Sequence, residues 1–246
     1  MVNYYFIGMI YEGIVILVAL PLLILSLRNY IRVRHRLALL LFLILLSYLC
    51  SITSSWLAKV LRVSLNIDYI IYADVPDPNT PISWILLRIS HFRISYVFIT
   101  IAICLTYLFK VKIFEEEFNL VKKNIIIGFT IFNLIFSLFI FQKGNVLFDV
   151  LIFFFVLILM NMVYIPFLLN AIKAYKSTDH PGFRKSFLSL SIMSVSYILV
   201  LFCLLVDRIY IFFGHYGFTI FYFLAWIFVI IGIFSTYFGY LRLDIK

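Results

Sequence analysis

Residues 217–241 read GFTIFYFLAWIFVIIGIFSTYFGYL and contain no charged side chain. A helix needs about 20 apolar residues to cross roughly 30 Å of hydrocarbon, so this stretch is long enough to span a bilayer. Six more stretches of the same kind occur in the chain. The predicted spans are residues 5–27, 37–61, 83–109, 124–141, 148–172, 187–206 and 217–241.

The composition of the whole chain agrees with these spans. Of 246 residues, 65% are hydrophobic, 20% aromatic and only 13% charged. A soluble domain is about a quarter charged, and this composition could not cover a water-facing surface. It excludes a soluble enzyme, a disordered chain and a disulfide scaffold. The spans are too long for barrel strands, so we predict an all-α membrane protein, a single seven-transmembrane helix bundle over residues 1–246.

The distribution of Lys and Arg predicts the orientation of the bundle. Alternate links are rich in basic residues, and the other links hold most of the aspartates. The basic residues of the rich links and the tail are Arg28, Arg32, Arg34, Arg36, Lys110, Lys112, Lys122, Lys123, Lys173, Lys176, Arg184, Lys185, Arg242 and Lys246. By the positive-inside rule, the N-terminus is outside and the C-terminus is cytoplasmic. We expect a multi-pass protein of the cell membrane, with the first span retained as an anchor and the lipid bilayer as its first partner.

Ionisable side chains inside the predicted spans gather toward the outer face. Arg88, His91 and Ser95 follow i, i+3, i+7 spacing and form one stripe of the third span, while Arg93 lies on another face. A helix with polar groups on two faces is costly to expose to lipid, so we expect this span to be central. Glu12, in the first span, is the expected buried partner of one of the arginines.

Three interpretations of these residues remain open. In the first, they form a structural ion-pair network, with Arg88 extending toward the membrane surface. In the second, Arg88, His91 and Arg93, together with Lys59, form a cationic pocket that binds a small acid or an anionic lipid head, with Glu12 as the counter-charge. A proton or ion path is the third.

Absent motifs and the composition of the links limit the functions that the sequence allows. The zinc-helix, nucleophile-elbow, phosphate-loop and paired-cysteine motifs are absent from the sequence, so we predict no enzyme activity, no metal and no cofactor. The short basic links also argue against nucleic acid as a partner. The outer loop, residues 63–82, contains three prolines and is expected to lie over the mouth of the bundle. Asp74 and Asp77 could bind a cation there, although a solvated turn is the simpler interpretation.

Two well-known seven-helix families lack their signatures here. The last span has no lysine for a retinal Schiff base, and the inner end of the third span reads Thr106-Tyr107-Leu108 in place of an acid-Arg-aromatic triplet. The chain instead resembles the seven-transmembrane input modules found before prokaryotic histidine kinases. The resemblance lies in Ser54-Ser55-Trp56, in the run Leu87-Arg88-Ile89-Ser90-His91-Phe92-Arg93-Ile94-Ser95-Tyr96, and in Phe114-Glu115-Glu116-Glu117.

This resemblance implies a sensor that passes an outside or membrane signal to a cytoplasmic output. The sequence ends about five residues after the last span, so we expect a separate cytoplasmic signalling partner. The alternative is a small transporter, or an integral membrane subunit of a larger complex. Ser235 and Gly239 give the last span a small-residue face that can pack within the bundle or form a homodimer.

Overall fold

The computed structural model describes residues 4–65, 80–114, 120–140, 146–214 and 217–241. Most of the outer loop, with Asp74 and Asp77, lies outside the described residues, as do Glu115, Glu116 and Glu117.

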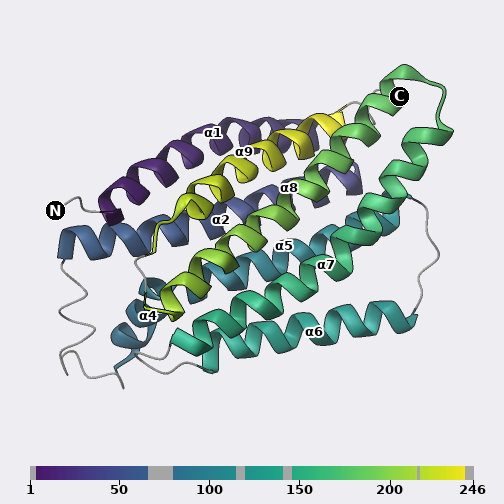
Figure 1. The fold of residues 1–246 in the computed structure, drawn as a ribbon. Helices are drawn as coiled ribbons and strands as arrows, with labels where there is room; N and C mark the ends of the chain where they lie inside the picture. The colour runs from purple at the N-terminus through teal and green to yellow at the C-terminus, as the bar shows by residue number, and fades with distance from the viewer. Residues whose placement is uncertain (1–3, 66–79, 115–119, 141–145, 215–216, 242–246) are drawn as a thin grey trace.

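Seven long apolar helices cross the molecule, as the sequence predicts, and no strand occurs in the described ranges. Each is long and apolar enough to cross a membrane, so the chain has the architecture of a multi-pass helical membrane protein. The helices are α1 (Tyr4–Val33), α2 (Arg36–Leu65), α5 (Arg93–Ile113), α6 (Leu120–Phe139), α7 (Val146–Ser177), α8 (Pro181–Phe212) and α9 (Ile220–Leu241), together with the short helix α4 (Pro81–Ser90). The start of α1 and the end of α9 lie at opposite ends of the bundle (Figure 1).

The third predicted span is wrong in one respect, because it is not one helix over residues 83–109. Helix α4 ends at Ser90, and α5 begins at Arg93 after a break at His91 and Phe92. Phe92 has φ 61°, in the left-handed region that interrupts a right-handed helix. The predicted stripe of Arg88, His91 and Ser95 therefore does not exist.

Six of the long helices form a closed ring. In order around the ring they are α1, α2, α5, α7, α8 and α9, and each contacts the next, with α9 returning to α1 (Figure 1). Helix α6 lies outside this ring against α5 and α7. Helix α5 contacts α2, α4, α6 and α7, so the expectation that the third span is central is confirmed.

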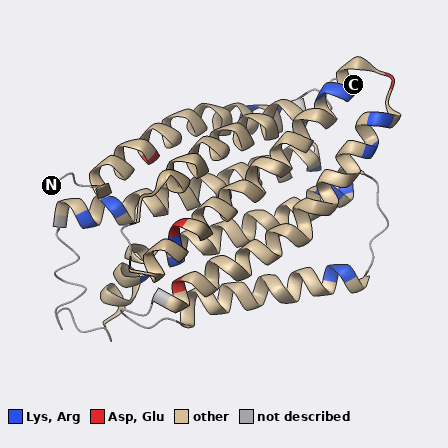
Figure 2. Cartoon of the chain, viewed as in Figure 1, with Lys and Arg blue, Asp and Glu red and all other residues tan. Residues whose placement is uncertain are grey.

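Charged residues concentrate at the ends of the helices (Figure 2). The described basic residues of the Lys- and Arg-rich links all lie at the end of the bundle where α1 and α5 finish, which we call the basic end. The opposite end, where α1 begins, is called the N-terminal end. Between the two ends the exposed surface is dominated by Leu, Ile, Val and Phe side chains, as expected for helices that face lipid.

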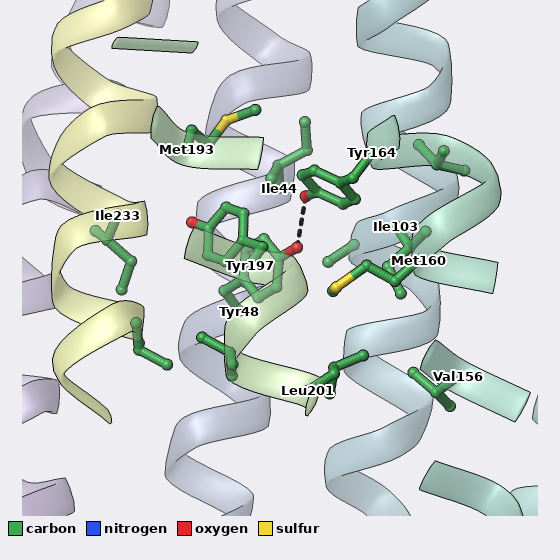
Figure 3. Packing of buried hydrophobic residues seen from close by; sticks show 14 of the residues in the cluster. Ile44, Tyr48, Ile103, Val156, Met160, Tyr164, Met193, Tyr197, Leu201 and Ile233 are labelled. Atoms are coloured by element: carbon green, nitrogen blue, oxygen red, sulfur yellow. Dashed lines mark hydrogen bonds between the residues drawn. The ribbon is translucent and has the colours of Figure 1, made fainter. Parts of the chain in front are cut away.

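Three tyrosines mark the middle of the ring. The rings of Tyr48 of α2 and Tyr197 of α8 stack with their centroids 4.5 Å apart, and the hydroxyls of Tyr48 and Tyr164 are 2.6 Å apart (Figure 3). The hydroxyl of Tyr164 also lies 3.1 Å from Thr106 Oγ1, and that of Tyr197 lies 3.1 Å from Thr236 Oγ1. We call Tyr48, Tyr164 and Tyr197 the tyrosine floor. All three hydroxyls have hydrogen-bond partners, as buried polar groups require.

Gly8 allows α1 to approach α2 and α9 closely. A Cβ at this position would lie 2.7 Å from Phe218 Cε1, 3.0 Å from the Tyr222 hydroxyl and 3.2 Å from Lys59 Cε. At Gly13, on the same helix, the nearest atom to a Cβ would be Trp56 Nε1 at 3.5 Å, an ordinary contact.

We therefore expect Gly8→Ala to destabilise the bundle by about 1–3 kcal/mol, the usual penalty of an overpacked core. The matched variant Gly13→Ala should cause no loss, because its methyl group fits and alanine favours the helix. Thermal unfolding of the two purified variants in detergent would check this. Equal midpoints for the two variants would contradict a close approach at Gly8.

Candidate functional site

A cavity lies inside the ring. All six ring helices contribute residues to the cavity wall, whereas α4 and α6 contribute none. The wall is formed mainly by apolar and aromatic side chains. Its lining residues are Glu12, Tyr48, Ser51, Ile52, Ser55, Lys59, Phe92, Ser95, Tyr96, Ile99, Phe153, Met160, Tyr197, Val200, Leu201, Leu204, Arg208, Tyr222, Ala225, Trp226 and Val229.

The cavity occupies only one half of the bundle. Its wall runs along α2 from Lys59 to Tyr48 and along α8 from Arg208 to Tyr197, so it ends at the tyrosine floor. The charged lining residues Glu12, Lys59 and Arg208 all lie toward the N-terminal end. The cavity is therefore polar at that end and apolar at the deep end.

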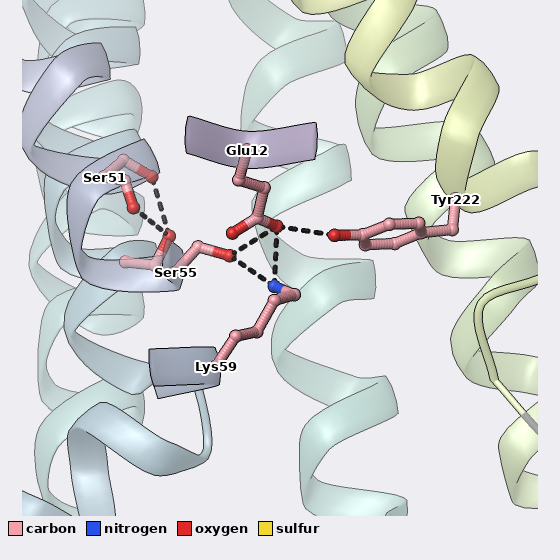
Figure 4. Close-up of polar contacts among 6 residues, drawn as sticks. Glu12, Ser51, Ser55, Lys59 and Tyr222 are labelled. Atoms are coloured by element: carbon pink, nitrogen blue, oxygen red, sulfur yellow. Dashed lines mark hydrogen bonds and ion pairs between the residues drawn. The ribbon is translucent and has the colours of Figure 1, made fainter. Parts of the chain in front are cut away.

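Glu12 and Lys59 form a buried ion pair at the polar end. Lys59 Nζ lies 2.6 Å from Glu12 Oε1, and the side chains are 2% and 0% exposed. The same carboxylate oxygen accepts hydrogen bonds from the hydroxyls of Ser55, at 3.1 Å, and Tyr222, at 2.8 Å (Figure 4). The carboxylate of α1 is thus bound from both α2 and α9.

Most of the polar atoms of this buried ion pair have a hydrogen-bond or cation–π partner. Lys59 donates a second hydrogen bond to Ser55 Oγ, at 3.2 Å, and its ammonium group lies 4.6 Å from the centroid of the Phe92 ring. Glu12 Oε2 has no hydrogen-bond partner among the described residues. Burying two charges is costly unless they pair and hydrogen-bond well, and breaking such a pair leaves an uncompensated charge. The predicted pairing of Glu12 with an arginine of the third span is therefore wrong, because Lys59 takes that place.

Phe92 gathers further cations around one ring. The guanidinium carbons of Arg208 and Arg62 lie 4.9 and 5.9 Å from its centroid, so three cations from α2 and α8 share this aromatic ring. Cation–π contacts of this kind are favourable at such distances. The Phe92 ring lines the cavity, so these contacts bring the three cations together at its polar end.

Arg208 differs from the other cations at this end. Its side chain is half-buried, lines the cavity, and has no carboxylate within ion-pair distance among the described residues. It is also close enough to Lys59 and Asp149 for a Coulomb interaction with each. Arg208 is the lining cation that remains accessible to a ligand.

Arg93 and His91 bind a carboxylate of α7. Arg93 Nη2 donates to Asp149 Oδ1 at 2.7 Å, and His91 Nδ1 lies 3.5 Å from Asp149 Oδ2. Neither Arg93 nor His91 lines the cavity. Their contacts attach the break between α4 and α5 to the first turn of α7.

Arg88 has a different position again. Its Nε donates to the carbonyl of Leu138 at 2.6 Å, and its guanidinium stacks over the Trp84 ring at 3.7 Å. The carbonyl of Leu138 belongs to the last turn of α6, where a cation is favoured by the unsatisfied carbonyls and the helix dipole. Arg88 therefore holds α6, the helix outside the ring, to the rest of the bundle.

The five predicted site residues thus divide into two groups. Glu12 and Lys59 line the cavity, whereas Arg88, His91 and Arg93 lie outside its wall. Sequence reasoning missed Arg208, because it ended the sixth span at residue 206, whereas α8 continues to Phe212. The signal that could have found it is the apolar run around residues 209–213, which carries the helix past the Asp207-Arg208 pair.

Comparison of the chain with protein-family models, curated proteins and solved structures gives no match.

A double-mutant cycle tests the Glu12–Lys59 pair. Lys59→Met should destabilise the protein by about 3–5 kcal/mol, because it leaves a buried carboxylate unpaired. The double variant Glu12→Gln/Lys59→Met should recover most of this loss, since no buried charge remains. Thermal unfolding in detergent measures the stability of Glu12→Gln, Lys59→Met and the double variant, with the exposed Thr53→Val as a control. Additive losses in the double variant would contradict direct pairing.

Arg88 and Arg93 should differ in their effects on stability. Arg88→Gln removes a cation from a helix terminus and should cost about 0.3–2 kcal/mol. Arg93→Gln leaves Asp149 without its closest cation and should cost more. Hydrogen exchange should show faster opening of residues 136–139, the last turn of α6, in Arg88→Gln only. Equal protection of that turn in both variants would contradict the capping role.

Proposed function

We propose that this chain is a sensor- or receptor-like membrane protein that binds a small anionic or lipid ligand in the ring cavity and signals to a separate cytoplasmic partner. The observation that carries the proposal is Arg208, a half-buried guanidinium in an apolar cavity with no carboxylate within ion-pair distance among the described residues. Ligand sites are typically apolar hollows with a few placed polar groups.

The charge around the cavity supports an anion. The described cations near its polar end are Lys59, Arg62, Arg93 and Arg208, and the described carboxylates there are Glu12, Asp149 and Asp207, so the cations outnumber the carboxylates by one. An anionic ligand would balance this excess of positive charge, and in a region of low dielectric such an interaction is strong.

The orientation of the proposed sensor follows the positive-inside rule. We place the basic end in the cytoplasm and the cavity in the outer leaflet of the cell membrane. Helix α8 carries both Arg208, at the polar end, and Arg184 and Lys185, at the basic end. A ligand that moves α8 at the cavity would displace this basic segment, where a cytoplasmic partner could bind. The resemblance to histidine-kinase input modules supports signalling of this kind, without catalysis by this chain.

A second candidate is an integral membrane subunit of a larger complex. The observation that favours it is the full burial of Glu12 and Lys59, which pair with each other as a structural network would. In that case the ion pairs stabilise the bundle, and the function belongs to the assembly. A small transporter is the other form of this alternative.

Purification from native membranes in mild detergent, followed by native mass spectrometry, tests the proposal. We expect a monomer or homodimer that retains a small acid or a lipid. Foreign polypeptides in fixed stoichiometry would instead support the complex-subunit alternative. A preparation free of both would contradict ligand binding in the cavity.

A cavity-filling variant locates the retained ligand. Ala225 is fully buried and lines the cavity, so Ala225→Leu should reduce the retained ligand at least several-fold because its side chain takes up ligand space. The matched control is Ala102→Leu, which overpacks a buried site away from the cavity wall. Equal retention in the folded fractions of Ala225→Leu and the wild type would place the ligand elsewhere.

A further inference from the structure

We infer that the ligand is a single-chain amphiphile with an anionic head, bound with its head at Arg208 and its chain directed toward the tyrosine floor. This inference rests on the proposed function and specifies the class of ligand.

The length of the cavity points to an extended molecule. Lys59 and Tyr48 are eleven residues apart on α2, and Arg208 and Tyr197 are eleven residues apart on α8. At the α-helical rise of 1.5 Å per residue, each pair spans about 16 Å. A compact anion would occupy only the polar end and leave the rest of this length empty.

The deep end of the cavity is suited to hydrocarbon. Its wall there includes Ile52, Met160, Leu201 and Val229. The hydroxyls of the tyrosine floor already bond to one another or to threonines, so Tyr48 and Tyr197 offer ring surface rather than unsatisfied polar atoms. An alkyl chain placed there would leave no tyrosine hydroxyl without a hydrogen-bond partner, and its burial away from water is favourable.

The contacts of the two cations that line the polar end indicate that the head group binds Arg208. Lys59 is already held by Glu12 and Ser55, and its side chain is 2% exposed. Among the described residues, Arg208 contacts the rings of Phe92 and Phe153 and has no carboxylate within ion-pair distance. Its planar guanidinium matches a carboxylate or a phosphate with two parallel hydrogen bonds. The two head groups share this chemistry, and the probes below distinguish them.

The charged head and the chain can be tested separately with matched probes. The probes are dodecanoate, dodecyl phosphate, dodecanol and butyrate, added to the protein in nanodiscs of neutral lipid. Binding is read by native mass spectrometry and by the shift in unfolding temperature. We expect dodecanoate or dodecyl phosphate to bind, with the tighter of the two identifying the head, and dodecanol and butyrate to bind at least tenfold more weakly.

Variants of the cavity wall then test where the head and the chain of the ligand bind. Arg208→Gln should weaken binding of the anionic amphiphile about tenfold or more, and Arg208→Lys should restore part of it. Arg88→Gln is the matched control, because this arginine lies at the same end of the bundle but outside the cavity wall, and it should leave binding unchanged. Val229→Phe should shift the preferred chain from dodecanoate to octanoate, because it shortens the deep end.

Each contrary result would overturn one part of the inference. Equal binding of dodecanol would overturn the anionic head, and equal binding of butyrate would overturn the chain. Preference for a two-chain phosphatidic acid would overturn the single-chain class. Failure of every probe would overturn the whole inference, while the ligand retained by the natively purified protein would still decide the proposed function.

Discussion

A charge within a hydrocarbon-facing bundle must find a partner, and the Glu12–Lys59 pair is where this constraint acts most strongly. Three helices meet at one carboxylate oxygen, since α1 supplies the acid, α2 supplies Lys59 and Ser55, and α9 supplies Tyr222. These contacts hold α1 and α9 together at the N-terminal end, where Gly8 allows their close approach. The ring closes at this seam, where the ion pair joins α1 to α2 and the Tyr222 hydrogen bond joins α1 to α9.

The remaining cations are distributed according to the same constraint. Arg93 uses the carboxylate of Asp149, Arg88 uses the carbonyl of Leu138 at the end of α6, and Arg208 uses aromatic rings. An ion pair, a helix terminus and an aromatic face are three different solutions to one problem, and of these three arginines only Arg208 lines the cavity. The distinction between structural and ligand-binding cations follows from these partners.

The sequence predicted the seven spans, although the third is two helices, and it predicted the burial of Glu12, because apolar length and isolated charges are local signals. Lys59 was expected in a cationic pocket rather than as the partner of Glu12. The break at Phe92 was not predictable in this way, since neither Gly nor Asn marks the left-handed residue. The partners of Arg88 and Arg93 lie about fifty residues away in the chain, which no helical spacing reveals. Arg208 was missed because charged residues were taken to end a span that continues through them.

The position of the tyrosine floor has a consequence for permeation. Beyond the floor, toward the basic end, the interior is filled by buried side chains that include Ile103, Phe109, Phe167 and Tyr240. The buried side chains beyond the floor are mostly apolar, so this half of the bundle is a region of low dielectric. If water enters the polar half, the membrane voltage falls mainly across this packed half. The ion pair at the polar end of the cavity would then experience little of that field.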